Sequence, residues 1–184
     1  MLKFLTIIIL LNFYNPAFSS VKDEIISRLK LTNILSFNFI QTIGKKEENG
    51  FCIIKYPKKI FCKYAGSNKK IIVSNGKSLV IKIKNSGNYY IYPLKKTPLE
   101  FLLDKEYLIS KINTLKPRVI NNQFLNYKIF ENNNEINIFF DKKYFNLVGW
   151  QTEDIYQNLS ITFISSIKIN EIIDDKIFRL PANN

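Results

Sequence analysis

The chain of 184 residues contains no histidine, only two cysteines, one tryptophan and three arginines. Without histidine it cannot build a Ser-His-Asp or Cys-His nucleophile system, or a metal site with imidazole ligands. Two cysteines alone are too few for a zinc site of normal composition. Glycine-rich phosphate loops and a Gly-x-Ser-x-Gly motif are also missing. The sequence therefore predicts no metal, no cofactor and no enzymatic activity.

Acidic residues are scarce, and several occur as adjacent pairs, at Glu47-Glu48, Glu153-Asp154 and Asp174-Asp175. Neighbours on a strand point to opposite faces, so none of these pairs is poised for acid–base catalysis. We interpret them as solvated turn residues.

Basic residues exceed acidic ones by 27 to 15, which gives a net charge of +12. Lysine (24), isoleucine (30) and asparagine (22) dominate, as in proteins from genomes rich in A and T codons. Readers of nucleic acids favour arginine, so we expect no nucleic-acid partner. Lysine pairs recur at predicted turns, where they solvate loops; alternatively, those on one rim meet anionic lipid headgroups. The pairs are Lys45-Lys46, Lys58-Lys59, Lys69-Lys70, Lys95-Lys96 and Lys142-Lys143.

Residues 1–20 are typical of a secretory signal peptide. Lys3 precedes the apolar run 4–11, and small residues follow near Ser19, where cleavage is expected. The alternative, a membrane anchor, is disfavoured because the run falls short of the roughly 20 residues that span a bilayer. The mature protein, residues 21–184, should then be a soluble periplasmic domain in an oxidising compartment.

The mature chain reads as one α+β domain with few helices and many short strands. Apolar residues recur at helical spacing over 20–31, with Val21, Ile25 and Leu29 on one face. From Leu35 onward the period changes to two, which indicates a strand with one buried face. Two antiparallel meanders follow, over 50–93 and 124–163, and Asn75-Gly76 predicts a tight hairpin with both residues at positive φ. We expect ten or eleven strands in one curled sheet.

Between the meanders, Thr97-Pro98-Leu99-Glu100 has the pattern of a capping box that starts a helix. Leu99, Leu102 and Leu103 share one face of this helix. The ordinary interpretation is a crossover helix that seals a core; the functional interpretation is a movable lid over a cavity.

A hairpin that turns at Pro57 pairs residues whose numbers add up to 114. Ile54 then faces Ile60, and Cys52 faces Cys62. The two cysteines are candidates for a cross-strand disulfide; alternatively, they are buried free thiols that behave as small hydrophobic residues.

Motifs spread over the mature chain resemble the LolA family, periplasmic carriers that take lipoproteins from the inner to the outer membrane. They are Leu35 with Phe39-Ile40-Gln41, Gly50 with Tyr56-Pro57, Tyr64, Ile72-Val73-Ser74-Asn75-Gly76-Lys77, Pro93-Leu94, Thr97-Pro98-Leu99, Asp154 ahead of Ser160-Ile161-Thr162-Phe163, and Phe178 with Pro181. One position departs from the family, because Tyr56 stands where an arginine ties sheet to lid. Lys55 points to the other face, so a polar latch must use another residue, for example the Tyr56 hydroxyl.

The resemblance implies an incomplete β-barrel, an antiparallel sheet curled around an apolar cavity and lidded by helices. The lid would carry Leu99, Leu102 and Leu103. The cavity would be lined by Leu35, Phe37, Phe39, Cys52, Ile54, Tyr56, Ile60, Cys62, Tyr64, Leu79 and Ile81.

The resemblance also implies a function. The protein would be a monomeric chaperone that binds the acyl chains of lipoproteins. Its partners would be acylated lipoproteins, an inner-membrane lipoprotein-releasing ABC transporter and, in some versions of the pathway, a separate outer-membrane acceptor. Two alternatives remain: a related carrier or sensor for another lipid, and a secreted β-rich interaction module with a solid core.

Overall fold

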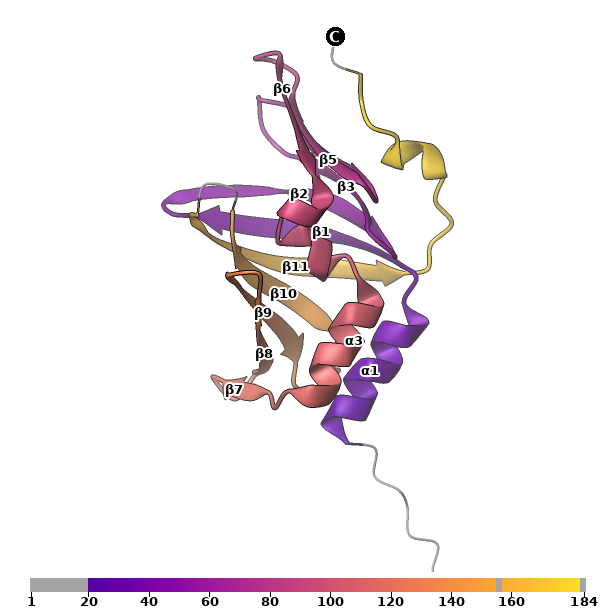
Figure 1. Ribbon diagram of the computed structural model, residues 1–184, viewed down its shortest axis with the longest axis vertical. Helices are drawn as coiled ribbons and strands as arrows, with labels where there is room; N and C mark the ends of the chain where they lie inside the picture. Colours follow the sequence, from indigo (N-terminus) through magenta and orange to yellow (C-terminus); the bar gives the residue numbers. More distant parts are fainter. Residues whose placement is uncertain (1–19, 155–156, 183–184) are drawn as a thin grey trace, which may run out of the picture.

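A single antiparallel sheet of eleven strands forms the body of the protein in the computed structural model, which describes residues 20–154 and 157–182 (Figure 1). The expectation of ten or eleven strands in one curled, unclosed sheet is confirmed. The spatial order is β6-β5-β4-β3-β2-β1-β11-β10-β9-β8-β7. The strands are β1 (Ile34–Ile43), β2 (Lys46–Lys55), β3 (Lys59–Tyr64), β4 (Lys70–Asn75), β5 (Ser78–Ile83), β6 (Asn88–Pro93), β7 (Arg118–Ile120), β8 (Phe124–Glu131), β9 (Asn134–Asp141), β10 (Leu147–Glu153) and β11 (Leu159–Ile169).

The hairpin between β2 and β3 has the register that the sequence predicts. Ile54 pairs with Ile60, and Cys52 pairs with Cys62. The Asn75-Gly76 turn differs in detail, because φ is positive only at Gly76. Asn75 stays in β4, and its side chain accepts hydrogen bonds from the backbone N–H groups of Lys77 and Ser78. This side-chain bonding stabilises a tight turn without the left-handed conformation at asparagine.

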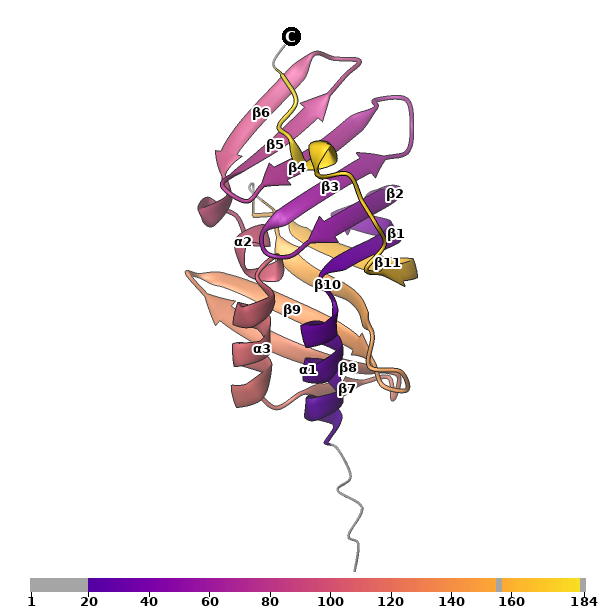
Figure 2. The ribbon, with the colours of Figure 1, turned by 90° about the vertical axis from the view of Figure 1, so that its right-hand side faces the viewer.

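In the described part of the chain, five short helical segments accompany the sheet: α1 (Val21–Leu31), η1 (Leu94–Lys96), α2 (Leu99–Leu102), α3 (Lys105–Thr114) and η2 (Asp175–Phe178). Helices α1 and α3 lie side by side against the β8–β10 end of the sheet (Figures 1 and 2). Ser20 caps α1 through a capping box with Asp23. Ile25 and Leu29 of α1 are buried together with Leu108 and Ile112 of α3, so this half of the concave face holds a packed core.

The helix expected at Thr97 is shorter than the sequence pattern indicates, and its capping box is not formed. The Thr97 hydroxyl donates backward to the carbonyl oxygen of Leu94 over 2.9 Å instead of capping α2. After Leu103 the chain turns, and α3 starts anew with Asp104 as its N-cap. Thr97 and Pro98 are both buried, so packing overrides the local capping preference.

The C-terminal segment crosses the convex face of the sheet over β3 and β4 (Figure 2). Phe178 is buried there, and Asp175 forms ion pairs with Lys55 and Lys59 at 2.5 and 3.3 Å. This cover explains why the outward-facing Ile53 and Val73 are apolar and buried.

None of the helices in the described ranges is both long and apolar enough to cross a membrane. The expected signal peptide, apart from Ser20, lies outside the described residues.

Candidate functional site: an apolar cleft and its lid

An open cleft of about 360 Å³ lies on the concave side of the β3–β6 half of the sheet. Its first wall is apolar and comes from alternate residues of β4, β5 and β6, which period-two alternation points to one face. On β5 these are Leu79, Ile81 and Ile83, and their neighbours across the sheet complete the wall. The remaining members are Ile72, Tyr90 and Tyr92.

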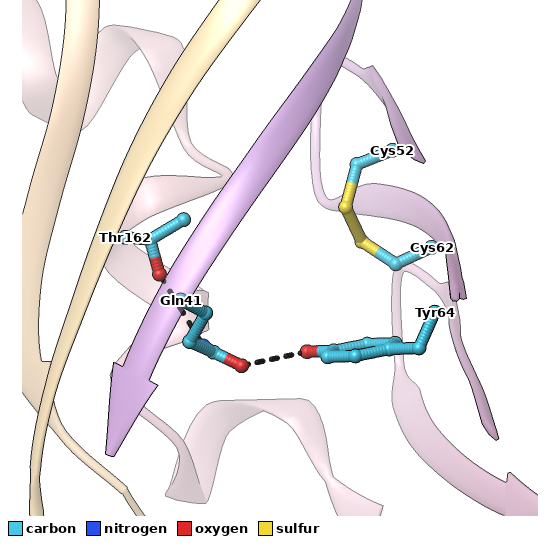
Figure 3. Close-up of a disulfide and its surroundings, with 5 residues drawn as sticks. All are labelled: Gln41, Cys52, Cys62, Tyr64 and Thr162. Carbon is cyan, nitrogen blue, oxygen red and sulfur yellow. Dashed lines mark hydrogen bonds between the residues drawn. A yellow bond between two sulfur atoms is a disulfide. The ribbon is translucent and has the colours of Figure 1, made fainter. Parts of the chain in front are cut away.

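The opposite wall of the cleft is polar and comes from the ends of β1, β10 and β11. Gln41 is at its centre. The Nε2 group of Gln41 donates to Ser160 Oγ at 3.1 Å. It also donates to Thr162 Oγ1 at 3.3 Å (Figure 3). Gln41 Oε1 accepts from the Tyr64 hydroxyl at 2.9 Å. Each of these half-buried or buried groups thus has a partner, which removes the cost of burying it without one. Thr152 and Glu153 extend this wall.

A lysine enters the cleft from β4. Lys70 forms an ion pair with Glu48, and its Nζ lies 3.7 Å from the centroid of the Tyr64 ring. Burial lowers the pKa of Lys70 below its ordinary value, more than the bond to Glu48 raises it. Burial also acts to raise the pKa of Glu48, yet the hydrogen bonds from Lys70 and Lys46 bring it below its ordinary value. The pair therefore holds two charges beside an apolar wall, with each charge neutralising the other.

A second, almost closed space of about 10 Å³ lies beneath the lid. Leu99 and Trp150 line both this space and the open cleft, so these two side chains separate them. The closed space is otherwise surrounded by apolar side chains from the sheet, the lid and α3. They are Ile54, Tyr56, Ile60, Leu102, Leu103, Leu108, Ile138 and Leu147.

The lid is the segment from Leu94 to Leu103, which comprises η1 and α2. The turn between β2 and β3 holds it in place. The Lys58 backbone N–H donates to the Leu103 carbonyl oxygen at 2.7 Å, and Lys58 Nζ lies 2.5 Å from Glu100 Oε1 and 3.4 Å from Asp104 Oδ2. A polar latch is thus present, and it comes from Lys58, the residue after Pro57, instead of from Tyr56, the residue before it.

The Tyr56 hydroxyl, considered above as a latch, makes no hydrogen bond to the lid within the described part of the chain. Tyr56 lines the closed space, and burial raises the pKa of its phenol above the ordinary value. Lys105 Nζ lies 6.0 Å from the centroid of its ring. Tyr56 therefore contacts its surroundings as an apolar ring.

The structure divides the expected cavity residues into three groups. Tyr64, Leu79 and Ile81 line the open cleft, together with the lid residue Leu99. Ile54, Tyr56, Ile60, Leu102 and Leu103 surround the closed space, and Leu35 lines a small space beside α1. The rest are buried without lining either main space: Phe37 packs edge-on against Trp150, and Phe39 against Tyr64, with ring centroids 6.0 and 4.8 Å apart. Cys52 and Cys62 complete this last group.

In the structure the sulfurs of Cys52 and Cys62 are bonded to one another (Figure 3). Their Cα atoms are 4.1 Å apart, and the bond joins β2 to β3 next to Tyr64, two residues before it on β3. The cross-link lies in the half of the sheet that carries the cleft.

Several residues of the site are absent from the sequence prediction. Ile83 could have been included, because it continues the alternation of Leu79 and Ile81 along β5. Tyr90 and Tyr92 on β6 pair with Ile81 and Leu79, so a predicted register between these two strands would have found them. Lys58 and Trp150 carried no such signal, since their roles depend on contacts with residues far away in the sequence.

Comparisons with known proteins agree with this architecture. A family model described as outer membrane lipoprotein carrier protein LolA matches residues 30–181. Curated proteins give no significant match. An uncharacterized conserved protein from Thermus thermophilus is similar in structure, with a TM-score of 0.52, 9% identity, and coverage of 88% of this chain and 95% of that one.

Two further solved structures are similar to this chain. A LolA superfamily protein from Nitrosomonas europaea has a TM-score of 0.45 and 10% identity, over 88% of this chain and 99% of that one. The MucA/MucB complex of Pseudomonas aeruginosa gives 0.49 and 8%, over 90% of this chain and 62% of that one. The family match includes every strand of the sheet, the lid and the cleft, and the chain therefore belongs to the LolA family of outer membrane lipoprotein carrier proteins.

Proposed function

We propose that this protein carries acylated lipoproteins through the periplasm, from the inner to the outer membrane, with their acyl chains in the open cleft. The observation that supports this most directly is the cleft itself: about 360 Å³, with one apolar wall from β4–β6. This volume lies within the range of roughly 300–1,000 Å³ that is usual for small-molecule sites. The family model that matches the chain is described as an outer membrane lipoprotein carrier protein, which agrees with this role.

The need for a cleft follows from the hydrophobic effect. At about 0.8 kcal/mol per methylene, exposing one chain of roughly 15 methylenes to water costs about 12 kcal/mol. A lipoprotein carries more than one such chain, so transfer between membranes requires a protein that shields them. The carrier must also release them without nucleotide hydrolysis, which favours a site that is neither deep nor fully apolar.

The two spaces on the concave face suggest how more than one chain is accommodated. The closed space holds only about 10 Å³, but it adjoins the cleft at Leu99 and Trp150, which line both. Movement of the lid at Leu99 would join them into one cavity lined by Leu102 and Leu103. On this proposal, Leu99, Leu102 and Leu103 cover the cavity when it is empty and swing aside when acyl chains enter.

The proposed route fixes the partners. An inner-membrane lipoprotein-releasing ABC transporter would load the cleft, and the outer membrane or an acceptor in it would receive the cargo. Residues 1–20 would direct the chain to the periplasm as a cleaved signal peptide.

Trp150 offers a direct test, because it is the only tryptophan of the chain and borders the cleft. We expect a synthetic diacylated lipopeptide with brominated acyl chains to quench Trp150 fluorescence, and the same peptide without acyl chains to leave it unchanged. Ile81→Glu should abolish quenching, since it places a carboxylate on the apolar wall. The control Phe130→Glu lies on an exposed position of β8 and should bind as the parent does.

The outcome against the proposal is equally specific. If the brominated lipopeptide fails to quench Trp150, and mass spectrometry of protein purified without detergent finds no acyl species, the cleft is not a lipid site. A bound lipid other than a lipoprotein would instead identify a carrier or sensor for that lipid. For the lid, a cross-link between cysteines placed at Leu102 and Ile54 should block loading; unchanged loading would contradict lid movement.

A further inference from the structure

The charge of this protein is distributed very unevenly along the chain. Residues 49–99 contain eleven lysines and no aspartate or glutamate. The rest of the chain contains 16 basic and 15 acidic residues, so this segment supplies nearly all of the net charge of +12. A codon bias toward lysine would act along the whole chain, and it does not explain why acidic residues are missing from one segment.

In space, this segment is one half of the sheet. It comprises the end of β2, strands β3 to β6, and the first part of the lid, which includes η1. Figures 1 and 2 show β6 as the outermost strand at the end of the molecule opposite α1 and α3. The positive charge is therefore concentrated at the end that carries the open cleft.

Acidic residues from elsewhere neutralise only four of the eleven lysines. Asp175 pairs with Lys55 and Lys59, Glu48 with Lys70, and Glu100 with Lys58. Among the described residues, the other seven have no ion-pair partner, and six of them are exposed. These seven are Lys63, Lys69, Lys77, Lys82, Lys84, Lys95 and Lys96.

An independent feature of the same end is the edge strand β6, with the sequence Asn-Tyr-Tyr-Ile-Tyr-Pro. It pairs only with β5, and Ile91 and Tyr90 are 56% and 39% exposed. Lys84 precedes the strand, and Lys95 and Lys96 follow it. Tyrosine, with an apolar ring and a polar hydroxyl, is enriched at membrane–water interfaces, where lysine contacts anionic headgroups.

We propose that the β6 edge, defined here as Lys84, Tyr90, Ile91, Lys95 and Lys96, docks on an anionic lipid surface. Tyr90 also lines the cleft, so docking at this edge would place the cleft beside the membrane. A lysine near a charged bilayer contributes about 1 kcal/mol, or about fivefold in affinity, and salt screens this attraction. The inference goes beyond the proposed carrier role and holds for any lipid cargo.

The test measures flotation of the full mature chain, without cargo, on phosphatidylcholine vesicles and on vesicles that also contain phosphatidylglycerol. We expect binding to the anionic vesicles only, and its loss at high salt. Lys95→Glu with Lys96→Glu should weaken binding more than tenfold. The control, Lys142→Glu with Lys143→Glu, makes the same change in net charge at the turn between β9 and β10 and should weaken it less than twofold.

Several results would overturn the proposal. These are absence of binding to anionic vesicles, an equal loss of binding in both double variants, and binding to soluble polyglutamate as tight as binding to vesicles. The last result would indicate an acidic protein as the partner.

Lysines can also protect an edge strand against aggregation. If the Lys95→Glu, Lys96→Glu variant self-associates in light scattering but binds vesicles as the parent does, protection is their role. The carrier proposal is tested by a different measurement, the quenching of Trp150 fluorescence by the lipopeptide. Failure of the docking proposal can therefore be told apart from failure of the carrier proposal.

Discussion

Lys58 Nζ lies 2.5 Å from Glu100 Oε1, and this ion pair joins the turn between β2 and β3 to the lid. The two side chains are 32% and 19% exposed, so water screens the pair only in part. The hydrogen bond with Glu100 raises the pKa of Lys58 above its ordinary value. Pairing therefore stabilises the closed lid throughout the neutral range, and the contribution of the Lys58 charge is lost as the pH rises through its pKa in the folded state.

We predict that Lys58→Met opens the lid more often while leaving the fold intact. The variant keeps most of the aliphatic side chain but removes the charge, so unfolding free energy should fall by about 1 kcal/mol. Hydrogen exchange of residues 99–104 should accelerate, and lipopeptide loading should become faster. Lys128→Met is the matched control, since it removes a comparable ion pair, with Glu135, outside the lid. Equal exchange at the lid in both variants would show that Lys58 is no latch.

This latch illustrates what the sequence could not predict. Glu100 is 42 residues away from Lys58, and their contact depends on how the curled sheet brings the turn beneath the lid. The position of Leu99 and Trp150 between the open cleft and the closed space could not be predicted either, because it also depends on contacts between residues far apart in the sequence. In contrast, the pairing of Cys52 with Cys62 could be predicted residue by residue, because the chain between them is short and Pro57 marks its turn.

Two further residues show where local patterns mislead and where they succeed. Thr97 has the sequence context of an N-cap, yet it is buried and bonds backward to Leu94, because tertiary packing outweighs a capping preference of about 1 kcal/mol. Ile83 lies in phase with Leu79 and Ile81 and extends the cleft wall, so alternation could have placed it there. Patterns along one strand were thus more reliable than patterns at the boundary of a short helix.

Gly50 should tolerate no side chain. A Cβ atom at this position would lie 2.3 Å from the Lys63 carbonyl oxygen and 2.9 Å from the ring of Phe39. Gly50→Ala must therefore push β2 away from β3, and we expect a loss of about 1–3 kcal/mol in urea unfolding. Ala65→Gly, at the nearby exposed turn, is the control against which this loss of unfolding free energy is compared. A loss below about 0.5 kcal/mol for Gly50→Ala, which is the spread of neutral surface changes, would mean that the strands and the Phe39 ring yield without strain.

The Cys52–Cys62 bond should stabilise the hairpin that carries the latch. Replacing both cysteines by valine retains apolar volume but frees the unfolded chain, and we expect a loss of about 2–4 kcal/mol. Mass spectrometry of alkylated protein should find no reactive thiol before reduction and two afterwards. The single variant Cys52→Val provides the control, because it leaves one thiol and no cross-link. If reduction of the parent protein leaves its unfolding midpoint unchanged, the bond contributes nothing to the hairpin.

Asp175 should make docking of the C-terminal segment sensitive to acid. Hydrogen bonds from Lys55 and Lys59 hold the pKa of its carboxyl below the ordinary value. The contribution of Asp175 to docking of the C-terminal segment is therefore complete above the ordinary carboxyl pKa. It is lost as the pH falls through the lower pKa that Asp175 has in the folded protein. The amide NMR signals of Ile177 and Phe178 should report this release during an acid titration. Asp175→Asn should abolish the transition, whereas Glu171→Gln, which removes an exposed pair with Lys168, should preserve it. An unchanged transition in Asp175→Asn would show that another carboxylate controls the segment.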